Sequence, residues 1–549
     1  MKLLIPVLIL LTLTFSSCQQ KADLIVKAKT IYTVNDNFDT AEAMAIKDGR
    51  IVAVGTYKEV AKAYTAGETL DAGDNIILPG FMDAHAHFFG LGKVGQIADL
   101  RKAKSWDETI EILNAFAKEH PDGWLTGRGW DQNDWDIKEF PTKEKLDALY
   151  PDRPVYLTRI DGHAAIVNQK ALEIAGYTVD TKIAGGNLLV KNGQLTGVLI
   201  DMAKDKMATI IPKPNENQVS QILTDAQAEC LALGLTSVVD AGLEAELVEA
   251  IERMHEDGSL KIRLNIMLSE SKEHIDYLIK RGEIKTDRLH VNGFKFYSDG
   301  ALGSRGAYLL KDYTDDPGNR GLLLLDTLDF KEKIKTIYTH GFQVNTHAIG
   351  DAANRLVLRV YSELLSEGND RRWRIEHAQV IAPEDFELFG RYSIIPSVQP
   401  THATSDMSWA EKRLGEERVE SAYAYRQLLI QNGWIPLGTD FPIEEVNPLF
   451  TFYAAVARKS SKGYPEGSFQ TENALTREEA IRGMTIWAAK GSFEEIEKGS
   501  LETGKFADFI VLDRDLMTVP EEFILDTKVL MTYVGGEKVY EPKEVIGDH

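Results

Sequence analysis

The chain has 549 residues, of which 44% are hydrophobic and 27% charged, and its formal net charge is −22 at pH 7. A single hydrophobic core stops growing at roughly 250–300 residues, although barrels with insertions run past roughly 400. We therefore expect one large domain with attachments, or two to three domains. The composition is that of a soluble globular enzyme. The acidic balance argues against a nucleic-acid partner, which requires a basic footprint.

The first residues have the pattern of an export signal. Lys2 precedes an apolar run, residues 3–13, that is shorter than the ~20 residues of a membrane-spanning helix. The run leads through two serines into Cys18, a pattern similar to a bacterial lipoprotein signal, in which that cysteine carries lipid. We expect residues 1–18 to be such a signal and Cys18 to anchor an exported protein to a membrane, on the periplasmic or cell-surface side. An ordinary signal peptide cleaved near the same place is the alternative.

Both ends of the remaining chain are rich in strand patterns. Near the N-terminus these are ADLIVKAKTIYTV and AEAMAIKDGRIVAVG, the second with an Asp-Gly hairpin turn. Near the C-terminus they are FADFIVLDRD and KVLMTYVGGEKVYE, the second with a Gly-Gly turn. We predict that residues 19–76 and 499–549 together form one small β domain, a β-sandwich.

The middle of the chain, residues 77–498, alternates short apolar strands with helical patterns. The eight strand candidates are IILPGFMDAHAH, TSVVDAG, RLNIMLS, NGFKFYSDG, FQVNTHAIGD, RWRIEHAQ, SIIPSVQP and WIPLGTDFP. Such alternation favours an α/β fold with parallel strands and crossover helices. Eight repeats predict a (β/α)8 TIM-type barrel, whose chemistry lies at the C-terminal ends of its strands. The interval between the first two strands is too long for a simple connection, so we expect an inserted subdomain at about residues 100–220.

Two histidines stand one residue apart at the end of the first barrel strand. Residues i and i+2 of a strand point to the same face, so His85 and His87 would both face the barrel mouth. Neutral imidazoles suit Zn, Fe, Ni or Mn, and two of them directed at one point form half of a metal site. Taken alone, such a pair is more often a surface or packed pair than a metal site.

Polar residues at four other strand ends strengthen the metal hypothesis. These residues are Lys295 in GFKFYSDG, His347 in NTHAIGD, His377 in IEHAQ and Asp440 in LGTDFP. Any one of them could be an ordinary polar residue that ends a strand. Six polar side chains at the same end of one barrel, however, predict a metal centre there.

Taken in order, these motifs resemble the amidohydrolase superfamily. The resemblance is strongest to its branch of metal-dependent hydrolases related to N-substituted formamide deformylase, amidohydrolase family 3. It extends over nearly all of the chain after the signal. It is carried by LPGFMDAHAH, GFKFYSDGALGSRGA, THAIGD, RIEHAQ, GTDFP and GSLETGKFADFIVLD. The resemblance implies a hydrolase that acts on carbon–nitrogen bonds other than peptide bonds.

The resemblance also implies two divalent metal ions, with zinc foremost and manganese, iron or cobalt as alternatives. His85 and His87 would bind the more buried ion, and His347 and His377 the other. Lys295, carboxylated on its amine, would bridge the two ions, because a carbamate is an anionic ligand whereas an ammonium group repels a cation. An ion pair between Lys295 and Asp299 or Asp440 is the alternative.

Three further residues receive roles from the same resemblance or from their setting. Asp440 would bind the first metal. It would also take a proton from the metal-bound water, which leaves the attacking hydroxide, and pass that proton to the leaving nitrogen. His163, in TRIDGHAAIVN, is a candidate to polarise the substrate oxygen, and a loop-shaping hydrogen bond to Asp161 is an equal alternative. Arg305, in GSRGA, is a candidate to bind a substrate carboxylate, although such an arginine can also simply cover a loop.

We therefore expect an exported, lipid-anchored metal hydrolase that cleaves an amide-like C–N bond, of N-acyl or N-formyl type, in a small-molecule substrate. A deaminase, a dipeptidase or an N-acyl amino acid deacylase could use the same site. Outside enzymes, the alternative is a catalytically weak substrate-binding lipoprotein. A homodimer is left open.

Overall fold

The structure is a computed structural model that describes residues 19–160, 162–183 and 186–543, so the predicted signal and Cys18 lie outside the described residues. The chain divides into two compact units. The first comprises residues 1–87, 227–248 and 261–549, and the second comprises residues 88–226 and 249–260. Within the described ranges, no helix is both long and apolar enough to cross a bilayer.

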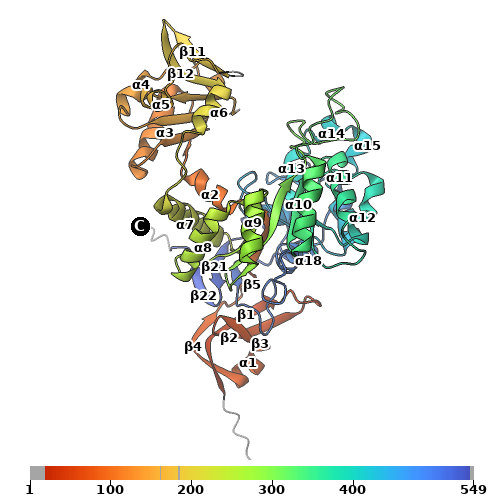
Figure 1. Ribbon diagram of the computed structural model, residues 1–549. Helices are drawn as coiled ribbons and strands as arrows, with labels where there is room; N and C mark the ends of the chain where they lie inside the picture. Colours follow the sequence, from red (N-terminus) through yellow and green to blue (C-terminus); the bar gives the residue numbers. More distant parts are fainter. Residues whose placement is uncertain (1–18, 161, 184–185, 544–549) are drawn as a thin grey trace, which may run out of the picture. The chain divides into compact units, whose positions relative to one another are not determined.

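Strands from both ends of the chain pair in one eight-stranded sheet of the first unit (Figure 1). Its strands are β1 (Gln20–Tyr32), β2 (Thr40–Lys47), β3 (Arg50–Gly55), β4 (Tyr64–Asp71), β5 (Ile76–Pro79), β20 (Phe509–Leu512), β21 (Val529–Val534) and β22 (Glu537–Tyr540). The order is β22-β21-β20-β5-β1-β2-β3, with β4 also paired to β1. The ends of the chain meet where β20 runs antiparallel to β5. Neighbouring residues of β1 serve opposite faces of this sheet, since Val26 and Ile25 belong to different core clusters.

Seven parallel strands of the first unit form the sheet of a nearly closed barrel. They are β6 (Phe81–Ala86), β13 (Leu235–Leu243), β14 (Arg263–Ser269), β16 (Leu289–Tyr297), β17 (Gln343–Ala348), β18 (Arg374–His377) and β19 (Ile395–Ser397). Their order is β19-β18-β17-β16-β14-β13-β6. All are almost fully buried, as parallel strands covered on both faces must be. The prediction of an α/β fold with a parallel barrel sheet is confirmed.

The eighth strand candidate, WIPLGTDFP, is not a regular strand, but it lies between the two edge strands. Leu437 forms a parallel bridge with Val398, just after β19. The Leu437 carbonyl also accepts a hydrogen bond of 3.1 Å from the Ala84 amide of β6. This irregular segment therefore occupies the place of the last barrel strand.

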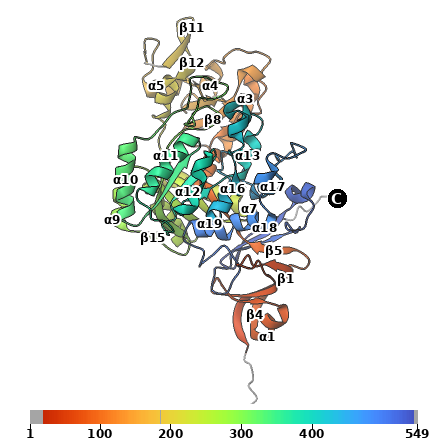
Figure 2. The same cartoon turned by 90° about the vertical axis from the view of Figure 1, so that its right-hand side faces the viewer.

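Helices between the strands lie along the outside of the barrel (Figures 1 and 2). They include α9 (Lys272–Arg281), α10 (Thr327–Thr339), α11 (Asp351–Ser362), α12 (Phe386–Arg391), α16 (Tyr425–Asn432), α18 (Arg477–Gly483) and α19 (Ile486–Gly491). Side-chain caps start several of them: Ser271 accepts from the His274 amide at α9, and Asp326 accepts from the Leu328 and Asp329 amides at α10. Both α10 and α11 pack on β17.

The second unit has its own six-stranded sheet, in the order β11-β12-β10-β9-β8-β7. Its strands are β7 (Ala98–Asp99), β8 (Leu125–Trp130), β9 (Val155–Arg159), β10 (Ala164–Val167), β11 (Gly186–Lys191) and β12 (Gln194–Asp201). Its helices include α2 (Phe88–Gly95), α3 (Trp106–Glu119), α4 (Glu144–Leu149), α5 (Gln169–Ala175) and α6 (Met202–Ala208), whereas α7 (Glu216–Ala232) and α8 (Ala245–Glu256) each contribute to both units. Trp130 and Trp135 are buried in its core.

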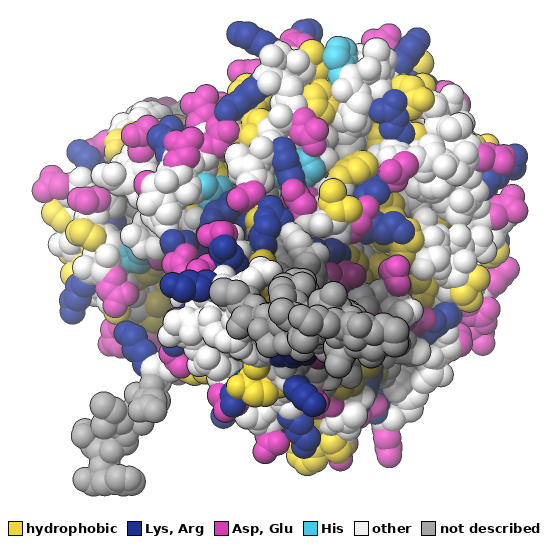
Figure 3. Space-filling view, turned by 90° about the horizontal axis from the view of Figure 1, so that it is seen from below, with side chains coloured by type: hydrophobic (Ala, Val, Ile, Leu, Met, Phe, Trp, Pro, Cys, Tyr) yellow, Lys and Arg dark blue, Asp and Glu magenta, His cyan; other side chains and the backbone are white. Residues whose placement is uncertain are grey.

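Charged side chains are mixed on the surface, but inside the first unit they form specific buried ion pairs. On the face drawn in Figure 3, acidic and basic side chains are interspersed. Inside, Glu494 is buried. Its Oε2 lies 2.8 Å from Lys498 Nζ, and its Oε1 lies 2.5 Å from Lys285 Nζ. Burial alone would raise the pKa of Glu494, but the two lysines outweigh it and lower this pKa to about 2. Elsewhere Arg263, in β14, pairs with buried Asp508, just before β20, and so joins the barrel to the terminal sheet.

The buried Glu494 predicts a specific loss of stability in acid. Its pKa is lower in the folded state than in the unfolded chain, so its stabilising contribution is present above about pH 4.5 and lost as the pH falls towards 2. Glu494→Gln should therefore lower the free energy of unfolding at pH 7 by about 3–5 kcal/mol, because a lysine is left buried without its partner. Urea denaturation should show the gap between wild type and variant narrowing below pH 4.5.

The exposed pair of Lys272 and Asp276 on α9 offers the matched control. Asp276→Asn should change the free energy of unfolding by less than about 1 kcal/mol at any pH. A gap for Glu494→Gln that stays constant from pH 7 to pH 3 would contradict the assigned pKa.

Candidate functional site

The six side chains predicted for a metal centre all belong to the first unit. His85 lies in β6 and His87 directly follows it, Lys295 lies in β16, His347 in β17 and His377 at the end of β18. Asp440 lies in the irregular segment that replaces the eighth strand. The imidazole centroids are 4.9 Å apart for His85 and His377, and 4.6 Å apart for His347 and His377. The C-terminal ends of parallel strands thus bring these residues together, as the barrel predicts.

Lys295 reaches the centre of this group because its neighbours face the other way. Phe294 and Phe296 are buried on the outer side of the sheet, and Phe296 packs against Phe330 of α10 with ring centroids 5.3 Å apart. Alternation along the strand directs Lys295 into the barrel. There its amine lies 3.3 Å from His85 Nε2, with the whole residue 1% exposed. Burial lowers the pKa of Lys295 to about 8, although Glu376 and Asp440 favour its charged form.

His85 is held by a buried chain of charges that the sequence analysis did not identify. Its Nδ1 is in short contact with Glu376 Oε2, and Glu376 Oε1 lies 2.7 Å from Arg374 Nε. Burial alone would raise the pKa of Glu376, but Arg374 and His85 outweigh it and lower this pKa to about 2. A carboxylate at Nδ1 fixes the tautomer whose Nε2 is unprotonated, so His85 presents a free lone pair to the site.

His377 is oriented in the same way by an amide. Its Nδ1 donates to Gln399 Oε1 at 2.8 Å, which leaves the lone pair of Nε2 free to face the site. His377 and Asp440 also have φ values of 75° and 66°, in the left-handed region that non-glycine residues rarely adopt. Such backbone conformations persist only where the surroundings impose them, and they concentrate at functional sites.

Asp440 is the acidic centre of the group. One carboxylate oxygen, Oδ1, lies 3.1 Å from His87 Nε2 and 3.6 Å from His85 Nε2. The other, Oδ2, lies 3.6 Å from the Nε2 atom of His402, a histidine for which the sequence analysis predicted no role. Burial alone would raise the pKa of Asp440, but its contact with His87 and the neighbouring His85 hold this pKa well below its usual range. Asp440 is therefore a carboxylate at neutral pH.

Two more buried aspartates fasten the loops that carry these residues. Asp83 accepts hydrogen bonds from the amide and the hydroxyl of Thr439, which ties β6 to the segment that bears Asp440. Asp299 accepts from the Ile349 and Gly350 amides, just beyond β17. Burial raises the pKa of each aspartate to about 7, and these hydrogen bonds oppose the shift. Both residues stand in motifs quoted above, but only the folded chain shows their partners.

The structure gives His163 and Arg305 other neighbours. His163 belongs to the second unit, where its Nδ1 lies 3.0 Å from Asp201 Oδ1 and its side chain is 76% exposed. Arg305 makes two hydrogen bonds to Asp315, of 3.1 and 2.9 Å, and Arg413 contacts the same carboxylate. Arg305 would therefore have to leave Asp315 to meet a substrate carboxylate. The predicted roles of both residues remain predictions.

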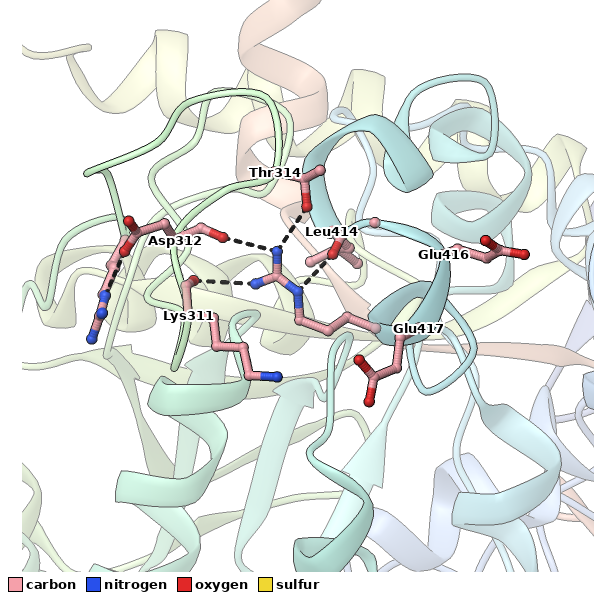
Figure 4. Close-up of a pocket in the computed structure, with 9 residues that line it drawn as sticks. Lys311, Asp312, Thr314, Leu414, Glu416 and Glu417 are labelled. Carbon is pink, nitrogen blue, oxygen red and sulfur yellow. Dashed lines mark hydrogen bonds and ion pairs between the residues drawn. The ribbon is translucent and has the colours of Figure 1, made fainter.

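A pocket elsewhere in the first unit is built differently (Figure 4). It lies between residues 311–320 and 414–418, and none of the predicted site residues is in its described lining. The guanidinium group of Arg418 donates to the Lys311 and Asp312 carbonyls and to the Thr314 hydroxyl. The guanidinium group of Arg418 is thus already engaged by the protein itself.

Comparisons with known proteins agree with this geometry. The sequence pattern of the amidohydrolase family matches residues 68–540. Protein LONG AFTER FAR-RED 3 of Arabidopsis thaliana is 32% identical, with 94% of this chain and 92% of that protein aligned. N-substituted formamide deformylase of Arthrobacter pascens is 26% identical over 95% of this chain and 99% of the enzyme. The chain belongs to the amidohydrolase family and is a hydrolase of that superfamily.

A solved structure is similar over nearly the whole chain. The crystal structure of an uncharacterised metal-dependent hydrolase from Pyrococcus horikoshii superposes with a TM-score of 0.77 at 28% sequence identity. The match covers 91% of this chain and 99% of that protein. The barrel with its terminal sheet is therefore an arrangement that an experimentally determined hydrolase shares.

The side chains present fit a divalent metal ion. One ligand atom each from His85, His377 and Asp440 lie within 4.8 Å of one another. Burial and Lys295 lower the pKa of His85 to about 4 and that of His347 to about 3, so both imidazoles are neutral, the form that binds metal. His347 Nε2 is buried without a hydrogen-bond partner in the described part of the chain. Asp299 Oδ1 lies 3.5 Å from this nitrogen, beyond hydrogen-bond range, so the nitrogen is available to a metal ion.

The contact between Glu376 and His85 predicts that Glu376 controls metal affinity. Glu376→Gln keeps the shape of the side chain but removes the carboxylate that orients His85 and raises its basicity. Affinity for zinc should fall about 10- to 100-fold, the usual effect of losing such a partner. Competition with a chromophoric chelator measures it. Glu367→Gln, which changes an exposed carboxylate paired with Arg391, is the control and should leave zinc affinity unchanged. Equal zinc affinities in wild type and Glu376→Gln would contradict the role of this contact.

Proposed function

We propose that the protein is a metal-dependent hydrolase that cleaves an amide-like C–N bond of N-formyl or N-acyl type in a small molecule. The observation that carries this proposal is the convergence of neutral, buried imidazoles on one carboxylate, Asp440, which is held ionised. The similarity to N-substituted formamide deformylase over 95% of the chain supports the substrate class. We further propose zinc as the metal, bound as two ions.

In this proposal His85, His87, His347 and His377 hold the metal together with Asp440 and a modified Lys295. A bound divalent ion would supply Lewis-acid polarisation of the substrate carbonyl and increase the acidity of an attacking water. Asp440 accepts a proton from that water as its oxygen bonds to the carbonyl carbon. The same carboxyl group then returns the proton to the leaving nitrogen as the C–N bond breaks. One carboxylic acid and one amine leave the site, and Asp440 is again ionised.

Removal of the metal and removal of the Asp440 charge should each abolish this reaction. Zinc-loaded protein should release amines from a panel of N-formyl and N-acyl amines, followed by mass spectrometry, and chelation should stop the release until zinc is restored. Asp440→Asn should lower kcat by about 10²- to 10⁴-fold, the usual contribution of a positioned general base to the rate. Activity that survives in protein shown by elemental analysis to lack any transition metal would contradict the proposal.

We also propose that Lys295 is carboxylated and bridges two metal ions. Support comes from its position, since a fully buried amine 3.3 Å from a metal-binding histidine would repel a cation unless it changed its charge. Lys295→Ala should reduce the metal content from two ions towards one or none, with a matching loss of turnover. Added acetate or propionate should restore part of both, because a small carboxylate can occupy the place of the carbamate. A Lys295→Ala variant with two ions and wild-type turnover would exclude the bridge.

We propose three further features of the protein, which concern its domains and its location. We propose that the barrel is of the (β/α)8 type and that residues of about 100–220 form a subdomain inserted into it. We propose that the terminal strands correspond to the small β-sandwich domain of this family. Finally, we propose that Cys18 carries lipid and anchors the protein on the outer side of a membrane. Detergent-phase partitioning that is lost in Cys18→Ala would support the anchor, and unchanged partitioning would refute it.

A further inference from the structure

One histidine at the site has no role in the reaction described above. His402 lies in the first turn of α13 (Pro400–Asp406), which begins just after β19. Its ring stacks on the His377 ring, with centroids 5.7 Å apart and planes inclined by 22°. Its side chain is 12% exposed, and its Nε2 is buried without a hydrogen-bond partner among the described residues. A buried ring nitrogen in this state is available to a bound ligand.

The surroundings fix the direction of this ring. The His402 amide donates to the Gln399 carbonyl at 3.1 Å, and the side chain of the same Gln399 holds His377. The flanking residues of the turn, Thr401 and Ala403, are buried, and α13 packs on α17 (Pro448–Ala457). His402 Nε2 therefore points towards Asp440 Oδ2, 3.6 Å away, a separation too long for a hydrogen bond.

We propose that His402 is a further catalytic residue, whose Nε2 accepts a hydrogen bond from the N–H group of the leaving nitrogen. This inference rests on the proposed function and deepens it by naming the substrate as a secondary amide. Asp440 returns the proton to the leaving nitrogen, so that nitrogen must bind beside Asp440, where Nε2 of His402 also lies. Its lone pair must face Asp440, and its N–H must therefore point elsewhere.

The hydrogen bond would act on the orientation of the leaving nitrogen. An N–H group buried in the site without an acceptor would lose the hydrogen bond that it makes in water, which disfavours binding. An acceptor next to Asp440 removes that loss and turns the nitrogen lone pair towards the carboxyl group that protonates it. Tertiary amides, which lack this N–H, would gain nothing from His402.

Two variants distinguish the effect of the acceptor nitrogen of His402 from the effect of its ring packing. His402→Phe keeps an aromatic ring to stack on His377 but has no acceptor, whereas His402→Gln loses the ring but keeps an acceptor oxygen. The probes are N-butylformamide and its N-methyl derivative, hydrolysed by the zinc-loaded full-length protein. His340→Phe, at the exposed C-terminal end of α10, is the matched control. Zinc content is measured in every protein, because loss of a metal ligand would lower it.

We expect His402→Phe to lower kcat/KM for N-butylformamide by about 10- to 100-fold, the usual effect of one lost hydrogen bond to a buried group. Its effect on the N-methyl derivative should be less than about threefold, and zinc content should equal that of wild type. His402→Gln should retain part of the preference for the secondary amide. The control should match wild type with both probes.

Each other outcome overturns the inference. Equal losses with both probes would make His402 a packing residue, and a parallel loss of zinc would make it a metal ligand. Wild-type kinetics in His402→Phe would leave it without a role, although the proposed hydrolase activity would stand. A wild-type protein that cleaves tertiary amides but no secondary amide would overturn the inference alone, and one that cleaves no amide would overturn the proposed function as well.

Discussion

The buried contact from Arg374 through Glu376 to His85 is the interaction on which the rest of the site depends. These three residues are fully enclosed, and burial of ionised groups is tolerated only when each is paired and hydrogen-bonded. Arg374 also donates to the Ala84 carbonyl at 2.6 Å and to the Ser397 hydroxyl at 2.7 Å. One guanidinium group thereby joins β6, β18 and β19 across the barrel. The same chain of contacts that stabilises the barrel interior sets the tautomer of the first histidine.

Closure of the barrel has a comparable double role. Residues 434–442, which close the barrel between β19 and β6, lack the regular pattern of a strand, yet this segment is fixed on both sides. The Asp440 amide donates to the His85 carbonyl at 2.8 Å, and the His87 amide donates to the Phe441 carbonyl at 2.8 Å. Reciprocal bonds of this kind leave His85, His87 and Asp440 little freedom to move separately. The irregular backbone, with Asp440 at positive φ, is the price of directing a carboxylate inward at the seam.

Local patterns were enough to predict the sheet and six of the converging side chains. Strand periodicity places His85 and His87 on one face, and the flanking phenylalanines direct Lys295 inward. Glu376, Gln399 and His402 escaped prediction because their importance lies in partners from distant strands and from a short helix. No spacing rule relates Gln399 to His377, which it contacts from the end of the next strand. The eighth candidate strand is a different case. Its apolar run correctly predicted which segment closes the barrel but not the irregular conformation of that segment.

Arg305 illustrates a further reason why sequence alone falls short. A glycine-flanked arginine near a strand end suits a substrate anion, but the folded loop supplies Asp315 instead, and Arg413 shares that carboxylate. Charged side chains acquire their roles from whichever opposite charge the tertiary structure brings near. The acidic composition of the chain makes such internal partners common, with 84 acidic and 62 basic residues.

The central claim is that the barrel mouth holds a metal ion on the residues that Glu376 and Gln399 orient. A crystal structure of the zinc-loaded protein, with anomalous diffraction data collected on both sides of the zinc absorption edge, tests it most directly. We expect one anomalous peak within about 2.0–2.1 Å of the Nε2 atom of His85 and a second peak at the same distance from the Nε2 atom of His377. Zinc bound elsewhere, with these two nitrogens more than about 3 Å from any peak, would contradict it.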